Sequence, residues 1–124
     1  MGGLIYKEEA FKIVGCCMEA HRELGKGHNE VIYKDALEIE FQRQGIQYKR
    51  ELEFKLAYKG VILPHNYFAD FVVMDKIILE AKAIECLTDS HIKQTLNYLA
   101  ASKLKLGLLV NFGEDSLNYK RVVL

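Results

Sequence analysis

The spacing of apolar residues changes along the chain from a helical period to an alternating one and back, and this order restricts the fold more than any other feature. Helices are predicted over about 7–24, 29–44 and 89–102, where apolar residues recur three and four positions apart. Gly25 and Gly45 follow the first two helices, as expected when glycine supplies the left-handed end of a helix. Two helices therefore precede a block of strands, and the third helix interrupts that block.

The remaining segments have strand patterns. They cover residues 51–58, 61–63, 68–73, 77–83, 106–112 and 119–123. The segment 77–83 is almost wholly apolar, which indicates a central strand covered on both faces. A helix connects it to 106–112, so these two strands should lie parallel. The sequence predicts an α/β or α+β fold, with a central mixed sheet flanked by helices, in one domain over residues 1–124.

The composition of the chain limits which classes of function it can have. The 17 basic and 17 acidic residues give a net charge of zero, whereas a dedicated nucleic-acid binder is usually basic. A metal site would add positive charge that this count misses, so neutrality does not exclude nucleic acid. The apolar stretches are too short and too often broken by charges to span a membrane. Three cysteines without a secretory signal predict a reducing, cytoplasmic location.

Three charged residues, Asp70, Glu80 and Lys82, fall in strands that otherwise resemble protein core. A buried charge is unfavourable unless it is paired or binds a ligand. If the turn before 77–83 centres on Asp75, Asp70 faces Glu80 across a hairpin, and Lys82 shares the face of Glu80. This arrangement requires a loop with an odd number of residues or a bulge, because a two-residue turn would place Glu80 on the opposite face.

Two carboxylates this close repel each other, which raises the pKa of one or requires a cation between them. A hard ion such as Mg²⁺ meets that requirement, and the Ala81 carbonyl could supply another oxygen. The same spacing also fits an ion-paired sheet edge, because an Asp followed some ten residues later by Glu-x-Lys often arises by chance. The apolar surroundings and the open end of the hairpin favour a functional site over that alternative.

The segment from Asp70 to Glu80-Ala81-Lys82 resembles the core motif of the PD-(D/E)XK nuclease superfamily. The whole chain more closely resembles the small bacterial and archaeal GxxExxxR proteins placed in that superfamily. The matching stretches are residues 21–27, Glu30 with Tyr33, 36–37, 58–60, 94–99 and 106–113. The chain departs from the pattern at Lys34, which replaces the arginine of the family name, and at His28-Asn29, which replaces an apolar pair.

The resemblance implies a restriction-endonuclease-like αβββαβ core and metal-dependent hydrolysis of phosphodiester bonds, with Mg²⁺ or Mn²⁺ as the cofactor. Asp70 and Glu80 would then bind the metal, and Lys82 would orient the attacking water or stabilise the developing charge. The resemblance also carries over a place in the metal shell for Glu30. The helix macrodipole alone is a second explanation for a glutamate at that end of a helix.

Gln94 and Tyr98 lie four residues apart on the third predicted helix, so their side chains share a face. Gln-x-x-x-Tyr resembles an accessory motif of one nuclease branch, which implies a role for both residues beside the phosphate. An ordinary helix surface, on which a tyrosine packs its ring and exposes its hydroxyl, gives the same pattern.

Together these features predict a metal-dependent nuclease that acts on nucleic acid, with DNA as the expected substrate. A nuclease-fold binding or assembly module without efficient catalysis is the main alternative, and the neutral charge favours it. A phosphohydrolase acting on small phosphoesters is a third alternative, and it would have a closed pocket rather than an open cleft. The small size predicts a homodimer, because 124 residues offer little surface with which to grip a duplex.

Overall fold

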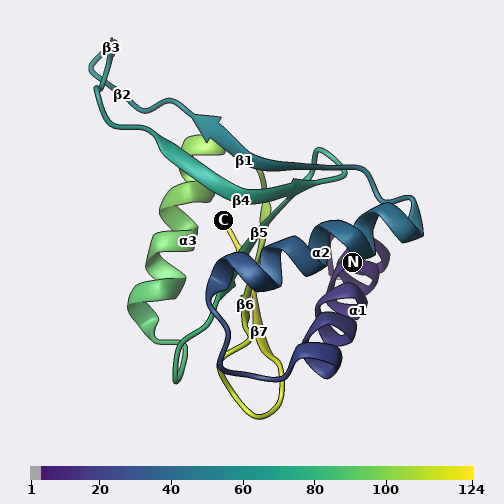
Figure 1. The fold of residues 1–124 in the computed structure, drawn as a ribbon. Helices are drawn as coiled ribbons and strands as arrows, with labels where there is room; N and C mark the ends of the chain where they lie inside the picture. Colours follow the sequence, from purple (N-terminus) through teal and green to yellow (C-terminus); the bar gives the residue numbers. More distant parts are fainter. Residues whose placement is uncertain (1–3) are drawn as a thin grey trace.

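The computed structural model describes residues 4–124 and contains helices packed on a mixed sheet (Figure 1). The helices are α1 (Lys7–Leu24), α2 (Glu30–Gln44) and α3 (Asp89–Ser102). The strands are β1 (Tyr48–Phe54), β2 (Ala57–Tyr58), β3 (Val61–Ile62), β4 (Tyr67–Val73), β5 (Ile77–Lys82), β6 (Leu106–Asn111) and β7 (Asn118–Val123). Five strands form one sheet in the order β1-β4-β5-β6-β7, and β2 pairs with β3 in a separate hairpin. This architecture confirms the predicted fold class.

The three helices occupy the predicted segments, and their ends have identifiable causes. Gly45 ends α2 in the left-handed conformation, with φ of 67°, and donates its N–H to the carbonyls of Phe41 and Gln42. α3 begins after Thr88, whose side chain forms a capping box with that of His91. Within residues 4–124, no helix is both long enough and apolar enough to cross a membrane.

The strand predicted over 51–58 is divided in the structure. Its first part belongs to β1, which starts earlier, at Tyr48, and pairs with β4 as far as Phe54 opposite Tyr67. Its last two residues form β2, the first strand of the separate hairpin. Alternation alone could not locate this break, because the polar and apolar pattern continues across it while the pairing partner changes.

Each face of the sheet carries its own apolar core. α1 and α2 cover one face, where the ring of Tyr33 stacks on that of Phe112 with centroids 4.5 Å apart. α3 covers the other face and lies close to β6 at Gly107. A Cβ atom at Gly107 would lie 2.8 Å from Thr95 Cγ2, so glycine permits this close contact between helix and strand. The central strands are therefore held between two packed layers.

β5 lies at the centre of the sheet, as its apolar sequence predicted. All of its residues are buried except Lys82, which is half-buried. β5 pairs antiparallel with β4 and parallel with β6. The connection through α3 therefore joins two parallel strands, as predicted. The candidate site residues of β5 thus lie at the end of a strand that is buried along almost its whole length.

Candidate active site

The two acids predicted to meet across the hairpin lie side by side where β4 and β5 separate. The backbone ladder between these strands ends at the pair Phe71 and Leu79. At the next position, the Asp70 amide donates a hydrogen bond to Glu80 Oε2 at 3.0 Å. The Ala81 amide donates to Asp70 Oδ2 at 2.8 Å. Each carboxylate therefore accepts a hydrogen bond from a backbone amide. In a regular β ladder, a carbonyl of the neighbouring strand would accept that hydrogen bond.

The turn between β4 and β5 makes this meeting possible. The pair Val73 and Ile77 closes the ladder, which leaves the three residues 74–76 in the turn. Two of these residues have positive φ, at 56° and 55°. The turn has the predicted odd length, and this length sets Asp70 opposite Glu80.

Glu80 is buried, with 5% of its surface exposed. Its Oε2 atom accepts hydrogen bonds from the Tyr67 hydroxyl at 2.9 Å and from the Asp70 amide. Burial, followed by the neighbouring Asp70 charge, raises the pKa of Glu80 to about 7, although both hydrogen bonds and Lys82 oppose the rise. The carboxyl is therefore partly protonated near neutral pH, and a bound cation would favour its ionised form.

Lys34, on α2, contacts two carboxylates. Its ammonium lies 2.7 Å from Glu51 Oε1 and 3.2 Å from Asp70 Oδ1, and its side chain is largely buried. Burial alone would lower the pKa of Lys34, but the contacts with Glu51 and Asp70 outweigh it and raise that pKa. Asp70 is thus partly neutralised by a lysine that the sequence analysis did not place at the site. Each carboxylate oxygen has two lone pairs, so Asp70 retains the capacity to bind a metal.

Glu51 reaches Lys34 at a point where β1 is distorted. The residues before and after Glu51 pair with β4 in one continuous register, but Glu51 itself has no ladder partner. Its φ of 54° lies in the left-handed region, which costs a non-glycine residue about 1–3 kcal/mol. Sequence reasoning identified Lys34 only as the position of the family arginine and did not single out Glu51, because neither the backbone conformation nor a contact between separate elements leaves a periodic pattern.

Tyr98 of α3 reaches the acid pair through Tyr67. The two rings stack with centroids 3.4 Å apart and planes inclined by 13°, and the Tyr67 hydroxyl donates to Glu80. Burial and the charge of Glu80 raise the pKa of Tyr98, while a hydrogen bond with Gln94 opposes this rise. Gln94 is exposed and stands beside Tyr98 rather than at the acids. Tyr67 was not predicted, because the first residue of an apolar strand gives no sign of a polar role.

Comparison with known proteins places this geometry in a family. Residues 7–122 match the sequence profile of the PD-(D/E)XK nuclease superfamily. The chain belongs to that superfamily. A solved structure described as "Crystal structure of SSO0001" has the same fold, with a TM-score of 0.52 and 17% identity over 98% of this chain and 78% of that one. No curated protein matches the chain.

The superfamily match agrees with the restriction-endonuclease-like fold predicted from the sequence. At 17% identity, the structural likeness to SSO0001 shows the fold alone. The match is to the PD-(D/E)XK superfamily as a whole, so membership in the narrower GxxExxxR group stays a prediction.

The acid pair of this PD-(D/E)XK protein suits a hard divalent cation. No group of three or more His, Cys, Asp or Glu side chains within residues 4–124 surrounds a metal position. Mg²⁺ needs fewer, because it keeps several waters and binds proteins through one or two carboxylates. Asp70 and Glu80 supply two, and Glu80 Oε1 accepts no hydrogen bond from the described residues. The donor set fits Mg²⁺ or Mn²⁺, and the Ala81 carbonyl stays a further predicted ligand.

The structure does not bring Glu30 into this group. Glu30 is the first residue of α2, one turn before Lys34, and is half-buried. It makes no hydrogen bond or ion pair with any other described residue, whereas Lys34 extends from the same helix to Asp70. A place for Glu30 in the metal shell stays a prediction.

Lys82 ends β5 two residues after Glu80 and pairs with Asn111 in the ladder to β6. Its charge favours the ionised form of Glu80, so its side chain lies within electrostatic reach of the acids. Among residues 4–124, no carboxylate forms an ion pair with Lys82. Its ammonium therefore remains available for a phosphate or a water molecule.

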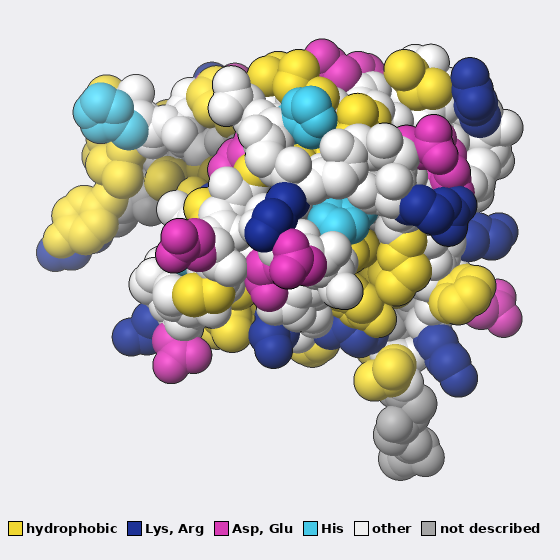
Figure 2. Space-filling view, turned by 60° about the horizontal axis from the view of Figure 1, so that its bottom comes forward, with side chains coloured by type: hydrophobic (Ala, Val, Ile, Leu, Met, Phe, Trp, Pro, Cys, Tyr) yellow, Lys and Arg dark blue, Asp and Glu magenta, His cyan; other side chains and the backbone are white. Residues whose placement is uncertain are grey.

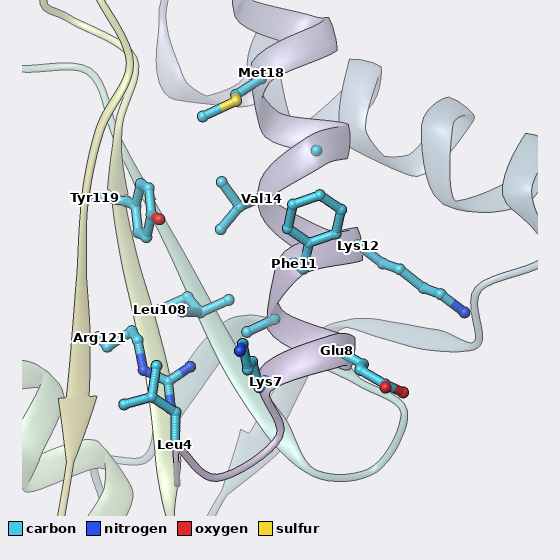
Figure 3. A pocket seen from close by; sticks show the side chains of 12 residues that line it. Leu4, Lys7, Glu8, Phe11, Lys12, Val14, Met18, Leu108, Tyr119 and Arg121 are labelled. Carbon is cyan, nitrogen blue, oxygen red and sulfur yellow. The ribbon is translucent and has the colours of Figure 1, made fainter.

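A separate apolar cavity of about 540 Å³ opens between α1 and the sheet (Figure 3). Phe11 and Val14 line it from α1, and Leu108 and Tyr119 line it from β6 and β7. Neither this cavity nor a smaller polar one near Lys26 is lined by a predicted site residue. The acid pair thus lies outside both of these cavities.

Proposed function

We propose that residues 1–124 form a single Mg²⁺- or Mn²⁺-dependent nuclease domain that hydrolyses phosphodiester bonds of nucleic acid, with DNA as the expected substrate. The observation that carries this proposal is the contact between Asp70 and the buried Glu80 at the separation of β4 and β5, beside Lys82. The charge of Asp70 raises the pKa of Glu80, so the two neighbouring carboxylates repel, and a divalent cation would relieve that repulsion. Superfamily membership favours nuclease chemistry over a purely structural acid pair.

In this proposal, the role of each site residue follows from its charge. Asp70 and Glu80 hold the metal in this proposal, with the Ala81 carbonyl as a further ligand. A bound divalent ion offsets the negative charge of the phosphate and lowers the barrier to attack by water. Lys82 orients that water or stabilises the charge that develops on the phosphoryl oxygens. Gln94 and Tyr98 contact the phosphate from the α3 side.

A cleavage assay tests the proposal directly. Single- and double-stranded DNA and RNA are incubated with wild-type protein in Mg²⁺, Mn²⁺ or EDTA, beside Glu80→Gln, Lys82→Ala and the exposed control Glu85→Gln. We expect metal-dependent cutting by the wild type and by the control, and a loss of about 100-fold or more in the two site variants. Site variants that cut at the wild-type rate would refute the assignment.

A catalytically weak binding or assembly module is the second candidate, because one observation favours it. Lys34 already neutralises part of the Asp70 charge, which reduces the need for a metal. Calorimetric titration with Mn²⁺ separates the candidates even without the right substrate. A nuclease binds Mn²⁺ through Asp70 and Glu80, and binding is lost in Glu80→Gln; a module that has lost its metal gives no heat in either protein.

We also propose that the protein forms a homodimer through the exposed surface of α1. Phe11 is 79% exposed at the edge of the apolar cavity, and such surfaces often mark interfaces. Glu8 and Lys12 beside it lie four residues apart, so two copies related by a twofold axis could pair them across the interface. Sedimentation at micromolar concentration should give a dimer for the wild type and a monomer for Phe11→Ser. A monomeric wild type would contradict this proposal.

A further inference from the structure

A hairpin arm, residues 55–66, extends beyond the point where β1 and β4 stop pairing. The last pair of that ladder is Phe54 with Tyr67. Beyond it, the Leu63 amide donates to the Leu56 carbonyl at 2.8 Å, and β2 pairs with β3 at the tip. Figure 1 shows the arm projecting from the β1 and β4 end of the molecule, away from the helices.

The tip of the hairpin arm exposes large apolar side chains. Tyr58, Val61 and Ile62 are 61%, 65% and 57% exposed. A two-stranded hairpin gains little stability by itself, and these side chains bury little of their surface on the rest of the protein. Folding therefore does not account for their apolar character, and a binding role does.

The charge of the hairpin arm indicates an anionic partner. Its twelve residues include Lys55 and Lys59 but no Asp or Glu, so the rest of the neutral chain has an excess of two acids. The Lys59 ammonium lies 5.4 Å from the centroid of the Tyr58 ring. Figure 2 shows the arm at the left with hydrophobic, basic and histidine colours and no acidic colour in this view. A partner that offers both phosphates and flat apolar groups matches this surface.

The base of the hairpin arm leads to the candidate active site. The ring of Phe54 stacks on that of Tyr67, with centroids 5.9 Å apart and planes inclined by 16°. Tyr67 in turn stacks on Tyr98 and donates to Glu80. A row of aromatic rings thus connects the base of the arm to the acids, and β4, which directly follows the arm, carries Asp70.

We infer that the hairpin arm binds single-stranded nucleic acid and directs it toward Asp70 and Glu80. Tyr58 stacks on a base, while Lys55 and Lys59 bind the neighbouring phosphates. Base stacking on an exposed aromatic ring requires an unpaired base, whereas a duplex offers the arm chiefly its backbone. The inferred binding depends only on the hairpin arm. The claim that the bound strand is then cut rests on the proposed function.

Fluorescence anisotropy in EDTA tests the binding without any cleavage. The probes are labelled 20-nucleotide oligo-dT, oligo-U and a DNA duplex, each titrated with the 124-residue protein. Tyr58→Ser combined with Lys59→Gln removes the proposed contacts. Tyr119→Ser combined with Lys120→Gln is the matched control, because the same exposed Tyr-Lys pair occurs there on β7. We expect the arm variant to bind single strands about tenfold or more weakly than the wild type, with the control unchanged.

Two outcomes would overturn the inference. One is equal binding of single strands by the arm variant, the control and the wild type, or no binding by any of them. The other is a sedimentation change in the arm variant with unchanged oligonucleotide binding, which would assign the arm to a second copy of the chain. Stronger binding of oligo-dT than of oligo-U, or the reverse, identifies the kind of strand.

The same proteins separate this inference from the proposed function. If the wild type binds through the arm but cuts nothing in Mg²⁺ or Mn²⁺, the nuclease proposal fails and the arm inference stands. If the wild type cuts, and the arm variant binds and cuts single strands equally well, the arm inference fails and the nuclease proposal stands.

Discussion

The ammonium of Lys34 lies 3.2 Å from Asp70 Oδ1, so one oxygen of the acid pair already faces a positive charge. The same ammonium contacts Glu51 at 2.7 Å, and the three groups lie together at the distorted position of β1. A metal bound by Asp70 would share this carboxylate with Lys34. In the proposed nuclease, the contact would therefore link metal affinity to a residue of α2 that does not itself offer a ligand.

We predict that Lys34→Gln strengthens Mn²⁺ binding by about tenfold, because removal of a nearby positive charge stabilises a bound cation. Calorimetric titration measures the affinity. Lys26→Gln serves as the control, since Lys26 pairs with the exposed Asp115. Weaker binding by Lys34→Gln would show instead that Lys34 holds Asp70 in position for the metal.

Glu80 should make the stability of the metal-free protein depend on pH. Its pKa is raised in the folded state to about 7, above the ordinary value of 4.5, so folding favours the protonated form. The stabilising contribution is complete below pH 4.5 and is lost as the pH rises through about 7, by an amount of about 3 kcal/mol. Glu80→Gln removes this loss, because the amide cannot ionise.

Urea unfolding in EDTA at pH 5 and pH 8 checks this prediction. We expect the free energy of unfolding to fall more between these pH values for the wild type and for Glu85→Gln than for Glu80→Gln. Saturating Mn²⁺ should reverse the trend in the wild type, because the metal stabilises the ionised carboxylate. Parallel pH dependence in Glu80→Gln and Glu85→Gln would contradict the assigned burial effect.

Tyr67→Phe should raise the pKa of Glu80 further, because the hydroxyl bond at 2.9 Å favours the ionised carboxylate. The ring stack on Tyr98 is retained in this variant. We expect a loss of stability of about 1–2 kcal/mol and Mn²⁺ binding that begins at a higher pH than in the wild type. Tyr119→Phe, altered at an exposed hydroxyl, is the control for the loss of a hydroxyl alone. An unchanged pH dependence of Mn²⁺ binding in Tyr67→Phe would separate Tyr67 from the site.

Local patterns predicted much of this structure. The odd turn length and the meeting of Asp70 with Glu80 followed from counting residues around Asp75, because β-strand side chains alternate with a period of two. The central position of β5 followed from its largely apolar sequence, since a strand covered on both faces is apolar at nearly every position. These features depend on residues that are close together in the chain, so the sequence alone is enough to predict them.

Other features depend on contacts between separate elements. Lys34 pairs with Glu51 and Asp70 at a position where Glu51 has a positive φ, and a glutamate in a strand gives no sign of that conformation. The place of Tyr67 between Tyr98 and Glu80 depends on how α3 lies on the sheet. Such contacts arise from the way separate elements pack together, and the spacing of apolar residues in the sequence does not indicate that packing.

The close packing of α3 on β6 gives a last prediction about how the site is held. A Cβ atom at Gly107 would meet Thr95 Cγ2 at 2.8 Å, and the branched threonine side chain has little freedom to move aside. Gly107→Ala should therefore destabilise the protein by about 2 kcal/mol. Thr95→Ser removes Cγ2 and keeps the hydroxyl that donates to the His91 carbonyl, so Gly107→Ala with Thr95→Ser should recover part of the loss.

Gly15→Ala is the control, because nothing lies within 4 Å of its added Cβ, and it should stabilise α1 by about 0.5–1 kcal/mol. Urea unfolding of Gly107→Ala, Thr95→Ser, the double variant and Gly15→Ala tests this prediction. A double variant no more stable than Gly107→Ala alone would mean that the clash lies elsewhere than at Thr95.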